Sequence, residues 1–333
     1  MEPFETPQQP NLQFESRIDL SALQTSMQAI RQEINKVIVG QERLIEQLLV
    51  ALLSNGHILL EGVPGIAKTI AVKLLAKTID ADFCRIQFTP DLMPSDILGT
   101  SVFNLKTSEF EFRKGAIFGN IILIDEVNRA PAKTQAALFE VMEERQITLD
   151  GVRYAMPPPF VVIATQNPIE QEGTYRLPEA QLDRFLFKTM VEYPGLAEEF
   201  EIIRREHEAG EHDKTAEVQK VVTGEQIVRY QALTRNLLIE PNLITYIAKI
   251  VQNTREHSFL YLGASPRASL AVLNASKGFA ALAGRDFVTP EDIKEAAIPV
   301  LRHRVIVSPE KEMEGVKADR IVRDILESIE IPR

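Results

Sequence analysis

The sequence predicts an α/β protein in which a mostly parallel sheet lies between helices and is followed by a smaller, all-helical domain. Two observations support this prediction. Short apolar runs alternate with helical segments up to about residue 195, without the polar–apolar alternation of a sheet that has one solvated face. Such runs are typical of parallel strands covered on both sides. Beyond that point the strand patterns largely stop and helical patterns continue.

The composition is that of a globular protein and narrows its possible partners. A length of 333 residues suggests about two domains, with 45% hydrophobic and 25% charged residues. The net charge of −10 argues against a broad nucleic-acid-binding surface. Cys84 is the only cysteine, so an intrachain disulfide is impossible and a cytoplasmic location is expected. With neither a signal peptide nor about 18 consecutive apolar residues, we expect no membrane insertion.

The elements of the α/β core can be predicted in order along the chain. Residues 1–20 are rich in Pro and Gln and are expected to form a flexible arm. Ser21 resembles an N-cap, and the helix it starts ends before Gly40. A second helix is predicted at 41–53. The core is expected to span 21–195, with strands at HILLEG (57–62), CRIQF (84–88), NIILIDE (120–126), FVVIAT (160–165) and FLFKTMV (185–191).

Two segments interrupt this pattern and are predicted to form β-hairpins, at 101–115 and 146–156. Asp150-Gly151 in the second is a strong turn signal. Each could be a plain surface hairpin or a functional insert. A charged linker is expected at 196–222 and a helical domain at 223–333. Its helices are predicted at about 223–235, 241–254, 266–283, 290–302 and 318–329, with Thr289 as the N-cap of the fourth.

The segment GVPGIAKT (62–69) nearly matches the phosphate-binding pattern G-x-x-x-x-G-K-[ST], with Ala67 in place of the second glycine. It lies between a predicted strand and a predicted helix, as a phosphate loop requires. Lys68 would reach the outer phosphates and Thr69 would bind Mg²⁺. Ala67 is expected in the first helical turn with a negative φ, so the loop is predicted to be functional. The alternative is an ordinary turn before a helix.

A phosphate loop needs a carboxylate partner, and the predicted strand IILIDE ends in Asp125 and Glu126. Asp125 would hold Mg²⁺, and Glu126 could act as general base toward the attacking water. Asn167 follows another predicted strand and could orient that water, although Asn-Pro is also a common turn opener. Two acids at a strand end are common by themselves. Together with the loop they indicate nucleotide hydrolysis.

Two arginines are candidates for stabilising the charge of the transition state. Arg184 lies in LPEAQLDRF, where a helix dipole or Asp183 could equally well hold it. Arg267 follows Pro266 in the first turn of a predicted helix, where a cation is disfavoured by about 0.3–1 kcal/mol. This position indicates an anionic neighbour such as a phosphate.

On these residues, the chain resembles the MoxR group of AAA+ ATPases from about residue 24 onward. The resemblance is carried by VIVGQE, GHILLEGVPGIAKT, IILIDEVNRAPAKTQAALFEVMEE, ATQNPIEQEGTYRLPEAQLDRF, GASPRA and VLRHR. It implies an AAA+ core with a helical lid that binds ATP and Mg²⁺.

The resemblance also implies a role for each candidate residue. Gln87 could match the residue that gates the catalytic glutamate. The other roles are adenine-side contacts for Val39 and Gly40, Walker A for Gly62, Val63, Pro64, Gly65, Ile66, Ala67, Lys68 and Thr69, Walker B for Asp125 and Glu126, sensor 1 for Asn167, an arginine finger reaching into a neighbouring subunit for Arg184, and sensor 2 for Arg267.

The resemblance further implies hexameric rings that act as chaperones. Members of the group assist the maturation of enzyme complexes or metal insertion into them, often with a partner that carries a von Willebrand factor A domain. The two hairpins would face the ring centre. The alternatives are a metal-insertion subunit similar to those of magnesium chelatase and a nucleic-acid-dependent motor, against which the overall acidity argues. Asp125, Glu126 and Asn167 argue against a non-hydrolysing switch.

Overall fold

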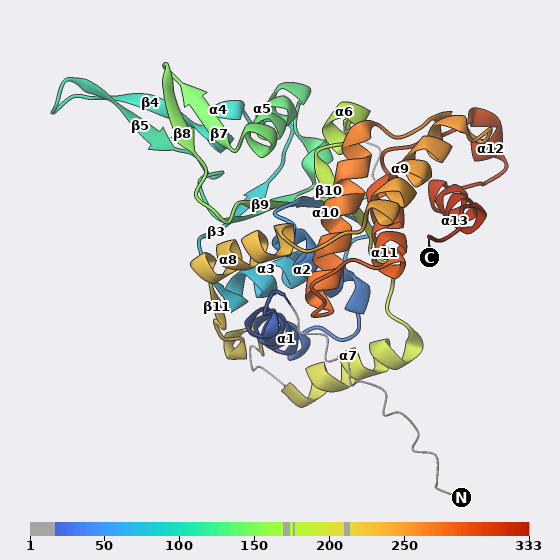
Figure 1. Ribbon diagram of the computed structural model, residues 1–333. Coiled ribbons are helices and arrows are strands. Elements are labelled where there is room, and N and C mark those ends of the chain that lie inside the picture. The colour runs from blue at the N-terminus through green and yellow to red at the C-terminus, as the bar shows by residue number, and fades with distance from the viewer. Residues whose placement is uncertain (1–16, 169–173, 176, 210–213, 333) are drawn as a thin grey trace, which may run out of the picture.

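The structure of this chain is a computed structural model that describes residues 17–168, 174–175, 177–209 and 214–332. The expected N-terminal arm, residues 1–20, lies almost entirely outside the described residues. The described chain forms a sheet with helices around it, a second group of helices and two hairpins that project from one side (Figure 1). None of the described helices is long and apolar enough to cross a bilayer.

The five predicted strands form one sheet in which every neighbouring pair is parallel, as expected. Successive residues of a strand enter different hydrophobic cores, with Ile58 on one side of the sheet and Leu59 on the other. This two-sided burial explains why the strand sequences are continuously apolar. In the order β10-β1-β9-β6-β3, the strands are β10 (Phe185–Met190), β1 (His57–Glu61), β9 (Val161–Gln166), β6 (Ile121–Asp125) and β3 (Phe83–Gln87).

The helices of the α/β part begin close to their predicted positions. Ser21, expected as an N-cap, is instead the first helical residue. Leu20 occupies the cap position, and the Asp19 carboxylate accepts the Ser21 N–H at 2.9 Å. The helices are α1 (Ser21–Asn35), α2 (Glu42–Leu53), α3 (Lys68–Thr78), α4 (Pro94–Leu98), α5 (Ala132–Glu144) and α6 (Glu179–Leu182), with a 3₁₀ turn η1 (Val127–Arg129).

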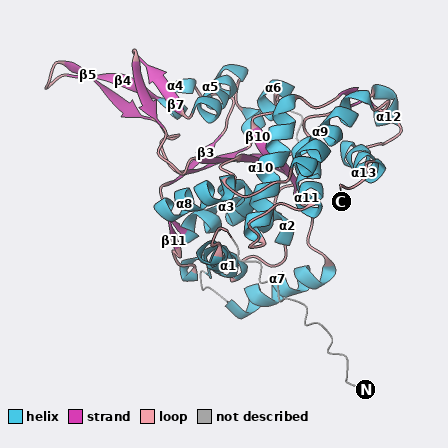
Figure 2. Cartoon of the chain, in the orientation of Figure 1, coloured by secondary structure: helices cyan, strands magenta, loops and turns pink. Residues whose placement is uncertain are grey.

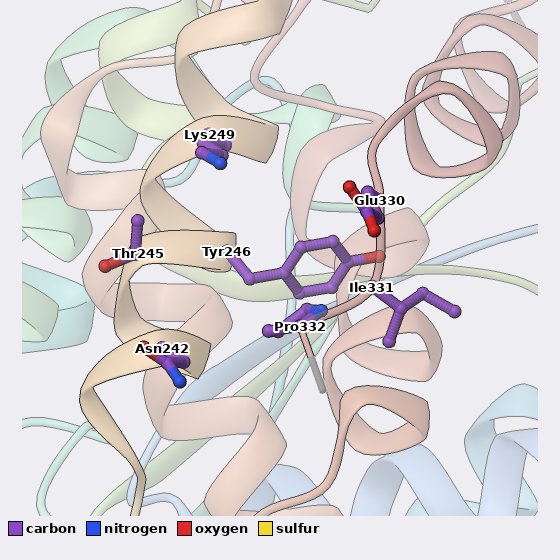
Figure 3. Close-up of a pocket in the computed structure, with 7 residues that line it drawn as sticks. All are labelled: Asn242, Thr245, Tyr246, Lys249, Glu330, Ile331 and Pro332. Atoms are coloured by element: carbon purple, nitrogen blue, oxygen red, sulfur yellow. The ribbon is translucent and has the colours of Figure 1, made fainter.

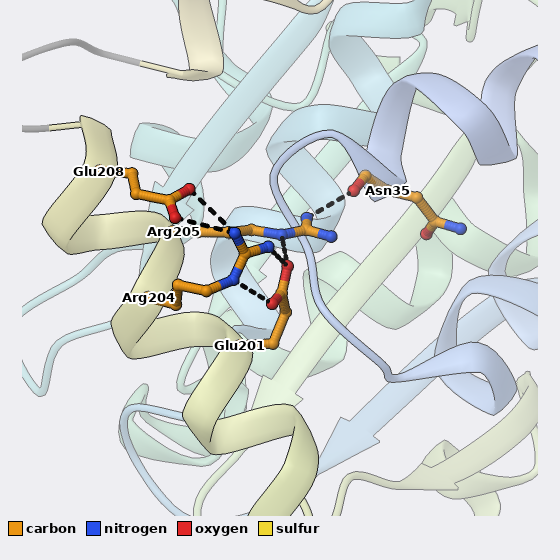
Figure 4. Close-up of polar contacts among 5 residues, drawn as sticks. All are labelled: Asn35, Glu201, Arg204, Arg205 and Glu208. Carbon is orange, nitrogen blue, oxygen red and sulfur yellow. Dashed lines mark hydrogen bonds and ion pairs between the residues drawn. The ribbon is translucent and has the colours of Figure 1, made fainter.

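The segment expected as a linker contains a helix, α7 (Leu196–Ala209), and a 3₁₀ turn, η2 (Lys214–Glu217). Its charged residues pair along the helix, because side chains three and four positions apart lie on one face. Arg204 bonds Glu201 and Glu208, while Arg205 bonds Glu201 and donates to the carbonyl oxygen of Asn35 at 3.0 Å (Figure 4). The charged composition of this segment therefore reflects an exposed helix that is tied to the end of α1.

The predicted C-terminal helices are present. Thr289 caps α11 in a capping box, with its N–H bonded to the Asp292 carboxylate at 2.8 Å, as predicted. The hydrophobic core of this region is continuous with the core beneath α1, α2 and α3. Residues 330–332 lie against α9 beside Tyr246 (Figure 3). The helices are α8 (Gly224–Arg235), α9 (Pro241–Glu256), α10 (Pro266–Leu282), α11 (Pro290–Leu301), α12 (Pro309–Met313) and α13 (Ala318–Ser328).

Two short strand pairs that the sequence analysis did not predict link distant parts of the chain. A parallel pair joins the end of α3 to the start of α8, and an antiparallel pair lies within the C-terminal region. They consist of β2 (Ile79–Asp80) with β11 (Val222–Thr223), and of β12 (Leu260–Leu262) with β13 (Ile306–Val307).

Both predicted hairpins are present and extend away from the helices (Figure 2). Asp150 and Gly151 both have positive φ, as the predicted turn requires. The hairpins contact each other, with the Phe112 and Tyr154 ring centroids 4.3 Å apart. Their strands are β4 (Gly99–Asn104) and β5 (Glu109–Lys114), then β7 (Gln146–Leu149) and β8 (Val152–Ala155).

Candidate nucleotide-binding site

The loop between β1 and α3 has the backbone of a phosphate cradle, but Ala67 departs from the expectation. Ala67 has φ +65° and ψ +13°, and it is the N-cap of α3 rather than a helical residue. The negative φ predicted from the sequence is therefore wrong. The chain reverses between Gly65, at φ +84°, and Lys68, and the residue just before the helix must adopt the left-handed conformation. Alanine tolerates this conformation at a cost of about 1–2 kcal/mol.

Lys68 and Thr69 begin α3 and turn toward the polar end of the sheet. The Lys68 ammonium donates to the carbonyl oxygens of Gly62 and, at 3.1 Å, of Val63. Burial lowers the pKa of Lys68, and the charge of Asp125 opposes that shift. The Thr69 hydroxyl donates to Asp125 Oδ1 at 3.2 Å, so the residues predicted to belong to Walker A and Walker B, which are far apart in the sequence, meet here.

Asp125 is the last residue of β6 and has a partner that sequence reasoning missed. Arg85 Nε lies 2.7 Å from Asp125 Oδ2, and the Thr165 hydroxyl donates to Oδ1 at 3.2 Å. Both carboxylate oxygens are thus engaged. The available signal was the spacing of Arg85 and Gln87, which places both side chains on one face of a strand. That β3 pairs with β6 could not be read from this spacing.

Glu126 follows β6 in a left-handed conformation, with φ +57°. Its N–H donates to the Thr165 hydroxyl at 3.0 Å. Its carboxylate accepts a hydrogen bond from Gln87 Nε2 at 2.9 Å and lies 3.0 Å from Arg129 Nε. The contact between Gln87 and Glu126 that the gating hypothesis requires is present.

Asn167 follows β9 and is buried. The carboxyl ends of parallel strands meet at one edge of a sheet, and a cavity of about 430 Å³ lies at this edge. Among the residues described, Val39 and Gly40 are not part of its lining; Gly40 lies beside Glu198 of α7. The lining includes Pro64, Gly65, Ala67, Lys68, Thr69, Arg85, Gln87, Asp125, Glu126 and Asn167.

The donors at this cavity fit a nucleotide with Mg²⁺. Among the described residues, no group of three or more His, Cys, Asp and Glu could hold a metal ion by itself. Mg²⁺ is usually held by one or two protein oxygens together with substrate phosphates and water. The Thr69 hydroxyl and the Asp125 carboxylate are such oxygens. The start of α3 supplies backbone N–H groups and Lys68 supplies a cation for the phosphates.

Arg184 lies at the opposite end of the strands from the phosphate loop. The next residue, Phe185, pairs with His57, the first residue of β1, whereas the phosphate loop follows Glu61, the last residue of β1. With five residues in β1 and a rise of about 3.3 Å per residue, the two ends of the strand are roughly 16 Å apart. Arg184 therefore does not share a cavity with the phosphate loop of this chain.

Arg267 lies with Arg184 rather than at the phosphate loop. Arg267 Nη2 is 2.9 Å from one oxygen of Glu143, and Arg184 Nε is 3.5 Å from the other. In this structure the anionic neighbour of Arg267 is Glu143, near the end of α5. Arg184 and Arg267 therefore lie on either side of one shared carboxylate, and we call these two arginines the arginine pair.

The fold and site can be compared with known proteins. Residues 57–187 match the model of an ATPase family associated with various cellular activities, and residues 252–325 match an AAA lid domain. Chaperone MoxR1 of Mycobacterium tuberculosis is 44% identical over 90% of this chain and 81% of its own length. A Bacillus subtilis protein called YeaC is 46% identical over 90% of this chain and 93% of its own length.

A solved structure is also similar along its length. The crystal structure of a candidate ATPase from Cytophaga hutchinsonii has a TM-score of 0.86 and 43% sequence identity. The match covers 94% of this chain and 97% of that one. The similarity therefore includes both the sheet and the C-terminal helices.

Proposed function

This chain belongs to the MoxR family of AAA+ ATPases, and on that basis we propose that it hydrolyses ATP to ADP and phosphate in order to remodel or mature protein complexes. The observation that carries the proposal is the convergence of Lys68, Thr69, Asp125, Glu126 and Asn167 on one cavity. This set supplies a phosphate cation, two magnesium oxygens, a base and a water-orienting amide.

Each residue has a chemical task in the proposed reaction. Lys68 and the backbone N–H groups at the start of α3 bind the phosphates. Thr69 and Asp125 would hold Mg²⁺, which would neutralise phosphate charge when bound. Asn167 orients a water molecule. Glu126 takes a proton from that water while the oxygen of the water attacks the γ-phosphorus. The bond between the γ-phosphorus and the bridging oxygen breaks, and ADP leaves. Gln87 holds the Glu126 carboxylate until the nucleotide is in place.

The arginine pair is proposed to act on the ATP of a neighbouring subunit. Arg184 and the phosphate loop of the same subunit are separated by the length of strand β1, so Arg184 can reach a γ-phosphate only if that phosphate is bound by another subunit. Because Arg267 shares Glu143 with Arg184, we propose that both arginines lie on the same side of this interface. A closed ring supplies such an interface to every subunit, and we propose a hexamer.

The client and partner belong to the same proposal. MoxR1 is called a chaperone, and we propose a protein client, a partner with a von Willebrand factor A domain and a cytoplasmic location for this chain. The adenine-side role of Val39 and Gly40 remains a prediction. So does the division into a core at 21–195, a linker at 196–222 and a lid at 223–333.

Mixed rings test the proposal. Glu126→Gln and Arg184→Ala should each bind ATP but hydrolyse it very slowly, since a general base contributes about 10²–10⁴-fold and an arginine finger about 10³–10⁵-fold. Mixing them should restore part of the ATPase activity, because an Arg184→Ala subunit keeps its own Glu126 and receives Arg184 from its neighbour.

The matched control is a mixture of Glu126→Gln with Lys68→Ala. Here the subunit with an intact Glu126 cannot bind ATP, so no interface is complete and activity should stay absent. A mixture of Glu126→Gln and Arg184→Ala that stays inactive despite demonstrated subunit exchange would show that Arg184 does not act in trans. Full turnover by Arg184→Ala alone would show that it is structural. Capture by Glu126→Gln rings, with and without ATP, would identify the client.

A further inference from the structure

Arg304 lies in the turn between α11 and β13, and its side chain is only 4% exposed. Its Nε donates to Asp183 Oδ1 at 2.7 Å. Its Nη2 donates to the carbonyl oxygens of Asp183 at 3.0 Å and of Phe185 at 2.6 Å. Nη1 donates to the carbonyl oxygen of Leu186 at 3.2 Å. One guanidinium from the C-terminal helices thus holds the backbone on both sides of Arg184.

The backbone at this point needs such a donor. Among the described strands, β10 is at the edge of the sheet and has β1 as its one neighbour. The register is irregular between His57 and Ile58, where Leu186 has no partner in the pairing. Edge and bulge carbonyl groups that are buried must bond something other than a strand. The planar guanidinium, with five N–H donors in a fixed fork, matches several carbonyl groups at once.

The same buried network reaches Arg267. Asp183 Oδ2 accepts a hydrogen bond from the Ser265 hydroxyl at 3.3 Å, and Ser265 is the N-cap of α10, two residues before Arg267. Asp183 and Arg304 therefore connect to both members of the arginine pair. Arg304 bonds the backbone on both sides of Arg184, and Asp183 bonds Ser265 near Arg267. The arginine pair is at the surface, with 27% of the Arg184 side chain and 56% of the Arg267 side chain exposed.

We propose that Arg304 is a positioning residue for the arginine finger: through Asp183 and the carbonyl groups beside Arg184, it sets the direction in which Arg184 reaches the neighbouring ATP site. The inference rests on the proposed trans function of Arg184. It assigns the C-terminal helices a part in hydrolysis at the next subunit, because movement of the turn that carries Arg304 moves the finger.

The test variant is Arg304→Lys, which keeps the positive charge but cannot bond four acceptors in one plane. The affinity for a fluorescent ATP analogue should stay within about twofold, because the phosphate loop lies at the opposite end of the strands from Arg304. The kcat should fall about 10–100-fold with little change in KM, since a misplacement of about 1 Å costs about 10²-fold. Mixing with Glu126→Gln should restore activity, as is expected for Arg184→Ala.

The matched control is Arg302→Lys, in the same VLRHR motif. Arg302 is also mostly buried and also bonds a β10 carbonyl oxygen, that of Lys188 at 3.2 Å, but this contact lies farther along the strand from Arg184. Its kcat should stay within about twofold. If Arg304→Lys does not fold, as judged by its thermal unfolding, the isosteric Asp183→Asn variant decides instead, with the same expected pattern.

The mixing experiment separates the two proposals. If Arg184→Ala is restored by Glu126→Gln but the folded Arg304→Lys is not, Arg304 acts within its own subunit and the positioning role is overturned. An unchanged kcat for Arg304→Lys, or an equal loss for Arg302→Lys, overturns it as well. If Arg184→Ala itself is not restored, the trans function fails and the inference fails with it.

Discussion

The left-handed conformation of Ala67 predicts how the stability responds to glycine at this position. Ala67→Gly should change the free energy of unfolding by an amount between about −0.8 and +1.6 kcal/mol, so no large loss is expected. The substitution relieves a strain of about 1–2 kcal/mol at φ +65°. It loses about 0.4–1 kcal/mol to the greater freedom of glycine in the unfolded chain, and less than about 0.8 kcal/mol from a partly buried methyl group. At a helical φ, the same change would instead cost about 1 kcal/mol in propensity alone.

Gly65→Ala is the matched control in the same loop. Gly65 has φ +84°, and no atom lies within 4 Å of the position that its added Cβ would occupy, so backbone strain is the main effect. This variant should lose up to about 1.6 kcal/mol, because the strain is only partly offset by the lower freedom of alanine in the unfolded chain. Both proteins are compared with the wild type by urea unfolding at pH 7.5 without nucleotide. A loss of 1 kcal/mol or more in Ala67→Gly would show that residue 67 is helical and that the left-handed assignment is wrong.

Three further predictions concern the site and the core. Lys68→Ala should weaken binding of a fluorescent ATP analogue at least tenfold, because a hydrogen bond to a charged group contributes about 1.5–3 kcal/mol. Its control, Lys73→Ala, lies on the exposed face of the same helix and should bind the analogue normally. Arg85→Ala removes the cation from Asp125, so half-maximal nucleotide binding should need less Mg²⁺; an unchanged requirement in a Mg²⁺ titration would contradict this. Burial lowers the pKa of His57 to about 3, and both of its ring nitrogens bond backbone groups. Neutral His57 therefore stabilises the fold fully above pH 6.5, and this stabilisation is lost as the pH falls toward 3. Between pH 7.5 and 5 the wild type should lose about 2 kcal/mol more than His57→Gln in urea unfolding; equal losses would show that His57 titrates normally.

Local patterns account for the parts of the site that could be predicted. The strand–loop–helix around Lys68 and the acids at the end of β6 are written within short segments, where apolar period and residue type decide the structure. Parallel strands then bring their carboxyl ends to one edge, so Asp125, Glu126 and Asn167 could be expected together. The hydrogen bond between Gln87 and Glu126 follows from the same rule once β3 is placed beside β6.

The sequence by itself determined the five strands of the main sheet, most helix limits, both hairpins and the position of the loop around Lys68, because each is encoded in a run of neighbouring residues. Only the tertiary structure decided that Ala67 is left-handed, that Arg85 bonds Asp125 and that Arg184 lies a sheet length from Lys68. The last two depend on how segments far apart in the chain are paired, whereas the conformation of Ala67 depends on how the loop reverses between Gly65 and Lys68. The register of β10 on β1 joins residues more than a hundred positions apart, and no local pattern records which residue of one strand lies beside which residue of the other.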